Sequence, residues 1–283
     1  MHLYRYPGFV GYWGVCKLSL ILHYILLEKT LLFARNRVSI LAAPIDVLTW
    51  DKALEQLFGW VTHHESRYVC ICNVHSVVTA SQDSAFKEVI ANADMATPDG
   101  APVAKLMRLL GYVGQQRING PDLMWRYCEQ AQYRDESVFF YGNSDESLAI
   151  LKSKLLTAFP TLKIAGAFSP PFRALTTEED EAIVTQINAS GAGLVWVSLG
   201  CPKQEYWMAE HRGRINAVMV GVGAAFDYHA GTLKRAPLWM QHNSLEWFYR
   251  LLSEPKRLWK RYLITNTLFM VKAFKQLLVA RLG

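Results

Sequence analysis

Strand-like apolar runs alternate with helical patterns along most of this chain, and that alternation is the strongest constraint on its fold. The runs occupy residues 38–42, 68–72, 137–141, 162–165, 194–199 and 217–220, with a short one ending near Thr97. Helical patterns occupy residues 50–64, 82–92, 101–110 and 145–159, and another begins with the hydroxyl of Thr177. Such alternation favours a parallel sheet flanked by helices. We therefore expect an α/β, Rossmann-like parallel-sheet core with helices on both faces.

The chain changes character after Gly231, where the strand-like runs stop. Residues 231–283 hold ten basic and two acidic side chains. The whole chain has 30 basic and 24 acidic residues, so the remainder is nearly neutral. A basic segment on a nearly neutral body favours an anionic partner: phosphate, a membrane surface or nucleic acid. We assign residues 38–230 to the α/β core and residues 231–283 to a basic, membrane-associating appendage of two or three helices.

Residues 1–37 form an apolar leader before the expected core. Its longest apolar run, residues 18–27, is interrupted by His23. No unbroken apolar run in the chain reaches the roughly 18 residues that a spanning helix needs. The charges that follow the run, and the lack of a small-residue cleavage site, argue against a signal peptide. We interpret the leader as a membrane-surface element or an oligomer contact.

The five cysteines are odd in number, and only Cys70 and Cys72 lie close together. This pattern is neither a disulfide framework nor a zinc spacing, which indicates a reducing cytoplasm. The sequence also lacks an Asp-x-Asp pair at a strand end and an H-x-x-x-H pattern. No metal and no cofactor is expected.

Polar segments follow five of the predicted strands, at residues 73–75, 97–100, 142–143, 200–205 and 221–227. Ligands of parallel α/β sheets bind outside the carboxyl ends of the strands. These segments can therefore converge on one pocket. The candidate residues in them are Asn73, Asp99, Gln204, Gly221, Gly223 and Asp227.

Asp99 and Arg117 each have two interpretations. Asp99 precedes a predicted helix, so it is either a carboxylate aimed at a ligand or an ordinary helix N-cap, which the local pattern favours. Arg117 lies in a polar loop, where it either meets a phosphate or is simply solvated.

The Gly221 and Gly223 pair is similar to the start of a dinucleotide motif. Phe226 replaces the third glycine, however, and the pair follows the last predicted strand rather than the first. Gln204 lies at a helix start, where free N–H groups and an amide can hold a nucleotide or sugar. The alternative for Gln204 is an ordinary charged helix start.

Taken together, several segments resemble the WecG/TagA/CpsF family of glycosyltransferases. They are residues 97–100 (TPDG), 117–123 (RINGPDL), 200–205 (GCPKQE), 221–227 (GVGAAFD) and 245–251 (LEWFYRL). The resemblance implies an inverting transferase that moves a sugar from a UDP-sugar donor to an undecaprenyl-diphosphate-linked sugar. It implies a role in teichoic-acid linkage units, enterobacterial common antigen or exopolysaccharide.

The resemblance also implies roles for individual residues. It makes Asp99 the general base rather than a cap, and it assigns substrate contacts to Arg117 and Gln204. The family's C-terminal arginines fall on Arg250, Arg257 and Lys260. Lys260 departs from the family's arginine and loses its bidentate fork. Ile71 stands where some members have threonine, so a donor contact there is lost or supplied elsewhere.

We therefore expect a peripheral enzyme on the cytoplasmic face of the inner membrane, whose partners are a UDP-sugar, a polyprenyl-diphosphate-linked sugar and anionic lipid. A nicotinamide-dependent oxidoreductase and a non-catalytic scaffold of a polysaccharide complex are the alternatives. No recognition motif for nucleic acid accompanies the basic appendage. The transferred sugar stays open among N-acetylmannosamine, its uronic acid, glucose and galactose, with glucose favoured by the leader and the motif set.

Overall fold

The computed structural model describes residues 35–282. The predicted leader, residues 1–37, lies almost wholly outside this range. Residues 37–283 belong to one compact unit, which includes the C-terminal helices. The role assigned to the leader therefore stays a prediction.

Six parallel strands form the central sheet in the order β4-β3-β8-β7-β5-β6, which confirms the predicted parallel core. The strands are β3 (Arg67–Cys72), β4 (Met95–Pro98), β5 (Ser137–Gly142), β6 (Lys163–Phe168), β7 (Leu194–Ser198) and β8 (Val218–Gly221). Strands β3 and β4 lie on one side of β8 in the sheet, whereas β5, β6 and β7 lie on the other side of β8. This change of direction beside β3 and β8 is where sheets of this class place ligands.

A short antiparallel hairpin precedes the sheet, where a single strand over residues 38–42 was expected. Its strands are β1 (Arg37–Ile40) and β2 (Ala43–Asp46). Leu41 turns the chain between them with a φ of 59°. The apolar run is present as predicted, but the chain reverses within it. No glycine or asparagine marks the position of this turn in the sequence.

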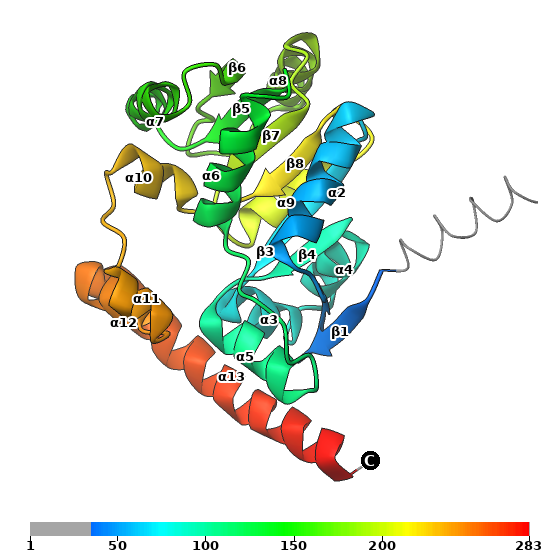
Figure 1. Cartoon of the computed structure of the whole chain (residues 1–283), viewed down its shortest axis with the longest axis vertical. Helices are drawn as coiled ribbons and strands as arrows, with labels where there is room; N and C mark the ends of the chain where they lie inside the picture. The colour runs from blue at the N-terminus through cyan, green and yellow to red at the C-terminus, as the bar shows by residue number, and fades with distance from the viewer. Residues whose placement is uncertain (1–34, 283) are drawn as a thin grey trace, which may run out of the picture. The chain divides into compact units, whose positions relative to one another are not determined.

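Helices cover both faces of the sheet, as predicted (Figure 1). Those on one face are α3 (Val74–Ala80), α4 (Ser84–Asn92), α5 (Ala101–Leu109), α8 (Thr177–Ala189) and α9 (Lys203–His211). Those on the other are α2 (Trp50–Thr62), α6 (Gly120–Ala131), α7 (Asp145–Ala158) and α10 (Ala225–Ala230). Side chains of β3 alternate between the two faces: Cys70 packs on the first and Val69 on the second.

Three helices were not expected from the pattern: α3, α6 and α10. Helix α3 is only seven residues long and begins directly at the Asn73 cap, while α6 begins at Gly120 inside the polar loop that contains Arg117. The N-cap of α8 was expected at Thr177 but is Thr176, whose hydroxyl accepts from Glu179 N while the Glu179 carboxylate accepts from Thr176 N. The reciprocal capping box decides between the adjacent threonines.

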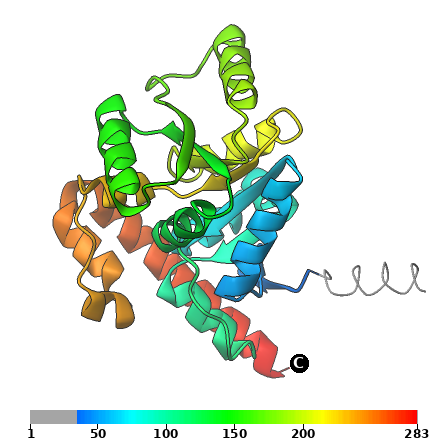
Figure 2. The same cartoon turned by 45° about the horizontal axis from the view of Figure 1, so that its top comes forward.

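Three helices finish the chain, in agreement with the prediction: α11 (Leu238–His242), α12 (Glu246–Ser253) and α13 (Pro255–Leu282). Helix α13 lies beside α3 (Figures 1 and 2) and buries Phe269 and Ala273 in the core. Lys272 Nζ donates to Ser81 Oγ at 2.7 Å, and Gln276 Oε1 accepts from Leu41 N at 2.9 Å. The appendage is thus fastened to the core along one face of α13.

Among the described residues, α13 is one helix that is long and apolar enough to cross a membrane, with a mean hydropathy of 1.3 over its best window. No unbroken apolar run revealed it, because Thr265, Asn266, Thr267, Lys272 and Lys275 interrupt the run. Only 17% of that window is buried.

Candidate active site

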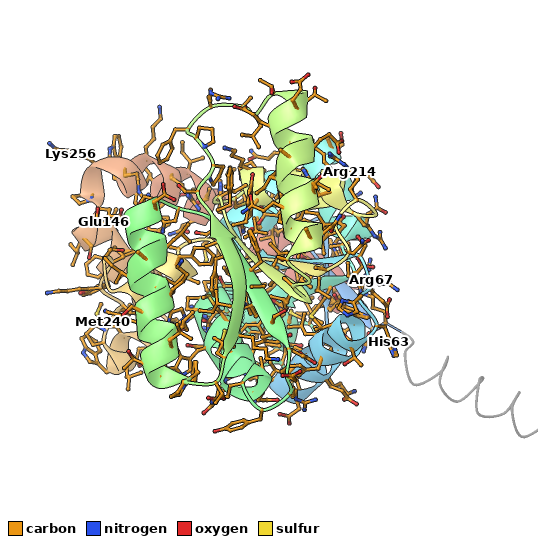
Figure 3. All side chains as sticks on the ribbon, turned by 90° about the horizontal axis from the view of Figure 1, so that it is seen from above. His63, Arg67, Glu146, Arg214, Met240 and Lys256 are labelled. Atoms are coloured by element: carbon orange, nitrogen blue, oxygen red, sulfur yellow. The ribbon has the colours of Figure 1, made fainter. Side chains whose placement is uncertain are left out.

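A cleft of about 950 Å³ opens at the carboxyl ends of the strands. In Figure 3, Arg67, which begins β3, and Arg214, which precedes β8, lie on one side, and Met240 and Lys256 of the C-terminal helices lie on the other. The cleft is lined by the loops after β3, β4, β7 and β8 and by residues of α12 and α13. It brings together nine of the ten candidate residues: Asn73, Asp99, Arg117, Gln204, Gly221, Gly223, Asp227, Arg250 and Arg257.

Asp99 lies just past the end of β4, and 17% of its side chain is exposed. The N-cap of α5 is Gly100, with a φ of 80° and no side-chain cap bond. Asp99 Oδ1 instead accepts from the Gly100 N–H at 2.6 Å. Burial raises the pKa of this carboxyl, against a lowering by Arg117. The geometry therefore favours a carboxylate directed at the cleft over an ordinary helix cap, and a raised pKa improves a carboxylate as a base.

Arg117 is not a solvated loop arginine. Its loop is tied to the end of β4, because Thr97 Oγ1 donates to Ile118 O at 3.1 Å and Ile118 N donates to Pro98 O at 3.0 Å. These bonds place the guanidinium beside Asp99, with 3.3 Å between Nε and Oδ1. Its Nη2 forms a second ion pair, 2.7 Å long, with Glu246 of α12. The two carboxylates raise the pKa of the guanidinium further, so Arg117 is a fixed positive charge in the cleft.

Asn73 caps α3 at the end of β3. Its side-chain oxygen accepts from His75 N at 2.9 Å and Ser76 N at 3.3 Å, so the oxygen is turned into the helix. His75 also lines the cleft, and burial lowers its pKa to about 4, which keeps the imidazole neutral at physiological pH. The Asn73 amide group is left as the donor available to a ligand.

Gln204 and Glu205 are buried at the start of α9, so this is not a solvated, charged helix start. Gln204 Nε2 donates to Glu205 Oε1 at 2.9 Å, and Gln204 Oε1 accepts from Gly223 N at 3.1 Å. A Cβ at Gly221 would lie 2.9 Å from Gln204 Nε2 and 2.7 Å from Met208, so the amide fits only against glycine. The loops after β7 and β8 are locked together through this amide.

Asp227 lies at the start of α10 on the far side of the cleft. Its Oδ1 accepts from Asn143 Nδ2 at 2.8 Å, which connects the loops after β5 and β8. Thr232 Oγ1 lies 3.3 Å from the same oxygen. Asp227 therefore holds the rim of the cleft.

Arginines of the C-terminal helices supply the positive charge of the cleft. Arg250 and Arg257 line it together with Arg261 of α13, whereas Lys260 is exposed and is not among the lining residues. Burial lowers the pKa of Arg261. Within residues 35–282, Arg250 Nε is buried and has no hydrogen-bond partner. The charge clustering of this segment was visible in the sequence, but the helical phase that selects Arg261 over Lys260 was not.

No group of three or more His, Cys, Asp or Glu side chains suited to a metal ion occurs within the described part of the chain. The cleft thus combines a buried carboxylate, an amide, two glycine-lined loop ends and several guanidinium groups. Such a set can take a proton and hold a phosphorylated anion.

The model of the glycosyl transferase WecG/TagA/CpsF family matches residues 38–282. The chain belongs to this glycosyltransferase family. It is 33% identical over 229 residues, 78% of this chain and 86% of the relative, to an N-acetylglucosaminyldiphosphoundecaprenol N-acetyl-beta-D-mannosaminyltransferase of Bacillus spizizenii. A Bacillus subtilis protein of the same name is 33% identical over 192 residues, 68% of this chain and 73% of the relative.

Membership confirms the expected resemblance and the transferase class. Three cleft residues of this family member had no role in the sequence interpretation: Glu246, Arg261 and His75. Glu246 stands in the quoted 245–251 motif, and that motif was the signal that could have indicated it.

Proposed function

We propose that this glycosyltransferase transfers a sugar from a UDP-sugar to a polyprenyl-diphosphate-linked sugar, with Asp99 as the general base. One observation carries the proposal: a single cleft is lined by the Asp99 carboxylate and by arginines of α12 and α13. The base and the anion-binding groups are therefore within reach of one pair of substrates.

In the proposed reaction, Asp99 removes the proton from an acceptor hydroxyl while that oxygen attacks the anomeric carbon of the donor. The bond from that carbon to the UDP oxygen breaks in the same displacement, which inverts the configuration. Arg250, Arg257 and Arg261 balance the negative charge that develops on the leaving UDP. These side chains can do this work without a divalent cation.

The loops after β7 and β8 suit the nucleotide part of the donor. Gly223 adopts a φ of 55° and has nothing within 4 Å of a Cβ position, so its backbone is open to the cleft. Gln204 holds that loop, and the first turn of α9 adds N–H groups. The broken glycine motif argues against a nicotinamide cofactor in the same place.

The exposed face of α13 suits a membrane surface. Trp259, Leu263, Val271 and Phe274 are more than half exposed on this helix. Basic residues lie among them, and each contributes roughly 1 kcal/mol near anionic lipid. We place the enzyme on the cytoplasmic face of the inner membrane, where the acceptor's lipid is held.

The names of the two Bacillus relatives support N-acetylmannosamine as the first candidate for the transferred sugar, and N-acetylglucosamine as the acceptor sugar. Glucose was expected from the leader and motif set, and it remains the second candidate. The test is to supply short-chain lipid-diphosphate-N-acetylglucosamine with a panel of UDP-sugars and NAD⁺, and to follow product mass. Addition of one sugar residue from one UDP-sugar supports the proposal; no transfer from any UDP-sugar would refute it.

A further inference from the structure

Two ion pairs join the loop that precedes α6 to the C-terminal helices. Glu246 of α12 pairs with Arg117 in that loop, and Arg235, which precedes α11, pairs with Asp122 at the start of α6. The polarity of the two pairs is opposite. The C-terminal part of the loop and the first turn of α6 are therefore both held to the C-terminal segment.

Arg117 is shared between two carboxylates. Its Nη2 is 2.7 Å from Glu246, and its Nε is 3.3 Å from Asp99. A guanidinium forms its strongest carboxylate contact through a two-pronged fork. Because Nη2 pairs with Glu246, Arg117 contacts Asp99 only through Nε, over the longer distance.

We propose that Glu246 is a positioning residue: by holding Arg117 away from a full pairing with Asp99, it makes the candidate base depend on docking of the C-terminal helices. This inference rests on the proposed function of Asp99. It assigns α12 a role in the proton transfer, in addition to the charge that the arginines supply.

The physical effect of Glu246 follows from its charge and position. Without it, Arg117 is free to turn its fork onto Asp99, occupying the carboxylate oxygens and stabilising the ionised form. The Gly100 N–H donates to the Asp99 carboxyl, and the titratable groups that act on it are Arg117, Glu246 and the Cys72 thiol at the end of β3. Burial raises the Cys72 pKa well above its usual range, so that thiol is neutral. Glu246 is therefore the charge that opposes Arg117, and it raises the pKa of Asp99.

Docking of the helices does not depend on Glu246 alone. Arg235 binds Asp122 through two contacts of 2.5 and 3.0 Å. Lys272 and Gln276 fasten α13 to Ser81 and to the β1–β2 hairpin. A variant at Glu246 can therefore lose its electrostatic role while the appendage stays in place.

The test uses the full-length chain with a UDP-sugar and lipid-linked acceptor. We expect Glu246→Gln to lower kcat about 10- to 100-fold, since a small misplacement of catalytic groups costs up to ~100-fold. The donor KM is expected to change little. The acidic limb of the pH profile should move to lower pH, because loss of the Glu246 charge lowers the pKa of Asp99. Glu246→Asp should recover part of the lost kcat.

Two controls separate positioning from docking. Asp122→Asn breaks the other ion pair, and it is expected to lower the melting temperature without moving the acidic limb. Glu181→Gln removes an exposed carboxylate outside the cleft and should leave both unchanged.

The inference is overturned if Glu246→Gln keeps the wild-type kcat and acidic limb. It is also overturned if the loss of kcat comes with an unmoved limb and a melting temperature lowered as in Asp122→Asn, which would show a docking role. Asp99→Asn, measured alongside, distinguishes failure of the Glu246 inference from failure of the Asp99 base assignment. If that variant is inactive while Glu246→Gln behaves as wild type, only the inference fails; if Asp99→Asn is active, the base assignment fails and the inference fails with it.

Discussion

The side chain of Gln204 donates a hydrogen bond to the carboxylate of its sequence neighbour Glu205, 2.9 Å away, and both are buried where α9 begins. Gln204 faces the loop after β8, whereas Glu205 Oε2 is buried without a hydrogen-bond partner within residues 35–282. A buried carboxyl with an unsatisfied oxygen costs folding free energy when it ionises. Burial raises the pKa of Glu205 to about 7.

This pKa gives the first prediction, for the stability of Glu205→Gln. The folded chain holds the Glu205 proton more tightly than the unfolded chain, whose pKa is near 4.5, so wild-type stability falls as pH rises from about 4.5 to about 7. The glutamine variant keeps the acceptor for Gln204 and does not titrate. As pH rises from about 4.5 to about 7, the free energy of unfolding of the variant should increase relative to that of wild type, by up to about 3 kcal/mol. Urea unfolding of both proteins at about pH 5 and about pH 8 measures this; a difference independent of pH would contradict it.

The second prediction concerns Arg261. Its guanidinium lines the cleft, whereas its neighbour Lys260 points to solvent. Arg261→Gln should raise the donor KM or lower kcat/KM by about 10- to 100-fold, the effect of losing a charged hydrogen bond. The matched variant Lys260→Gln should have the smaller effect. Equal effects, or a larger one for Lys260, would return the role to the residue expected from the family's arginine spacing.

The third prediction is that turnover survives excess EDTA. The cleft offers guanidinium groups to the leaving UDP, and those groups need no metal to balance its charge. The measurement is the initial rate with and without chelator, and then with added magnesium or manganese. Loss of activity that added metal restores would show a cation site in the working enzyme.

The fourth prediction is that the exposed face of α13 carries membrane binding. Replacing Leu263, Val271 and Phe274 together by glutamine should reduce co-sedimentation with anionic vesicles, because all three are more than 60% exposed and contribute little to the core. Glutamine at Val113 and Tyr133, which are 79% and 82% exposed on the core, is the matched control. Circular dichroism checks that both variants are folded. Undiminished vesicle binding by the α13 variant would assign the membrane contact to another part of the chain.

The fold was predictable because its signals are local. Alternation of apolar runs and helical patterns gave the parallel sheet, and side chains at strand ends gave most of the cleft. Helix α3 was missed because seven residues are too few to show a clear period. The β1–β2 hairpin was missed because Leu41, rather than glycine, adopts the left-handed turn conformation.

The electrostatics of the site depend on contacts between distant segments, which a single sequence does not reveal. Nothing near Arg117 indicates that Glu246 would share it with Asp99. Arg261 was passed over because a one-residue difference in helical phase decides which basic side chain faces the cleft. Family resemblance supplied roles for Asp99 and Arg117, and the three-dimensional arrangement supplied their shared partner Glu246.

The most direct test of the account is the rate of sugar transfer by Asp99→Asn. The amide keeps the shape of the side chain and can still lie beside Arg117, but it cannot accept a proton at neutral pH. We expect kcat to fall about 10²- to 10⁴-fold, the usual cost of losing a general base. The affinity for UDP, measured by calorimetry, should stay close to wild type. Near wild-type turnover by this variant would contradict the assignment of Asp99 as the base.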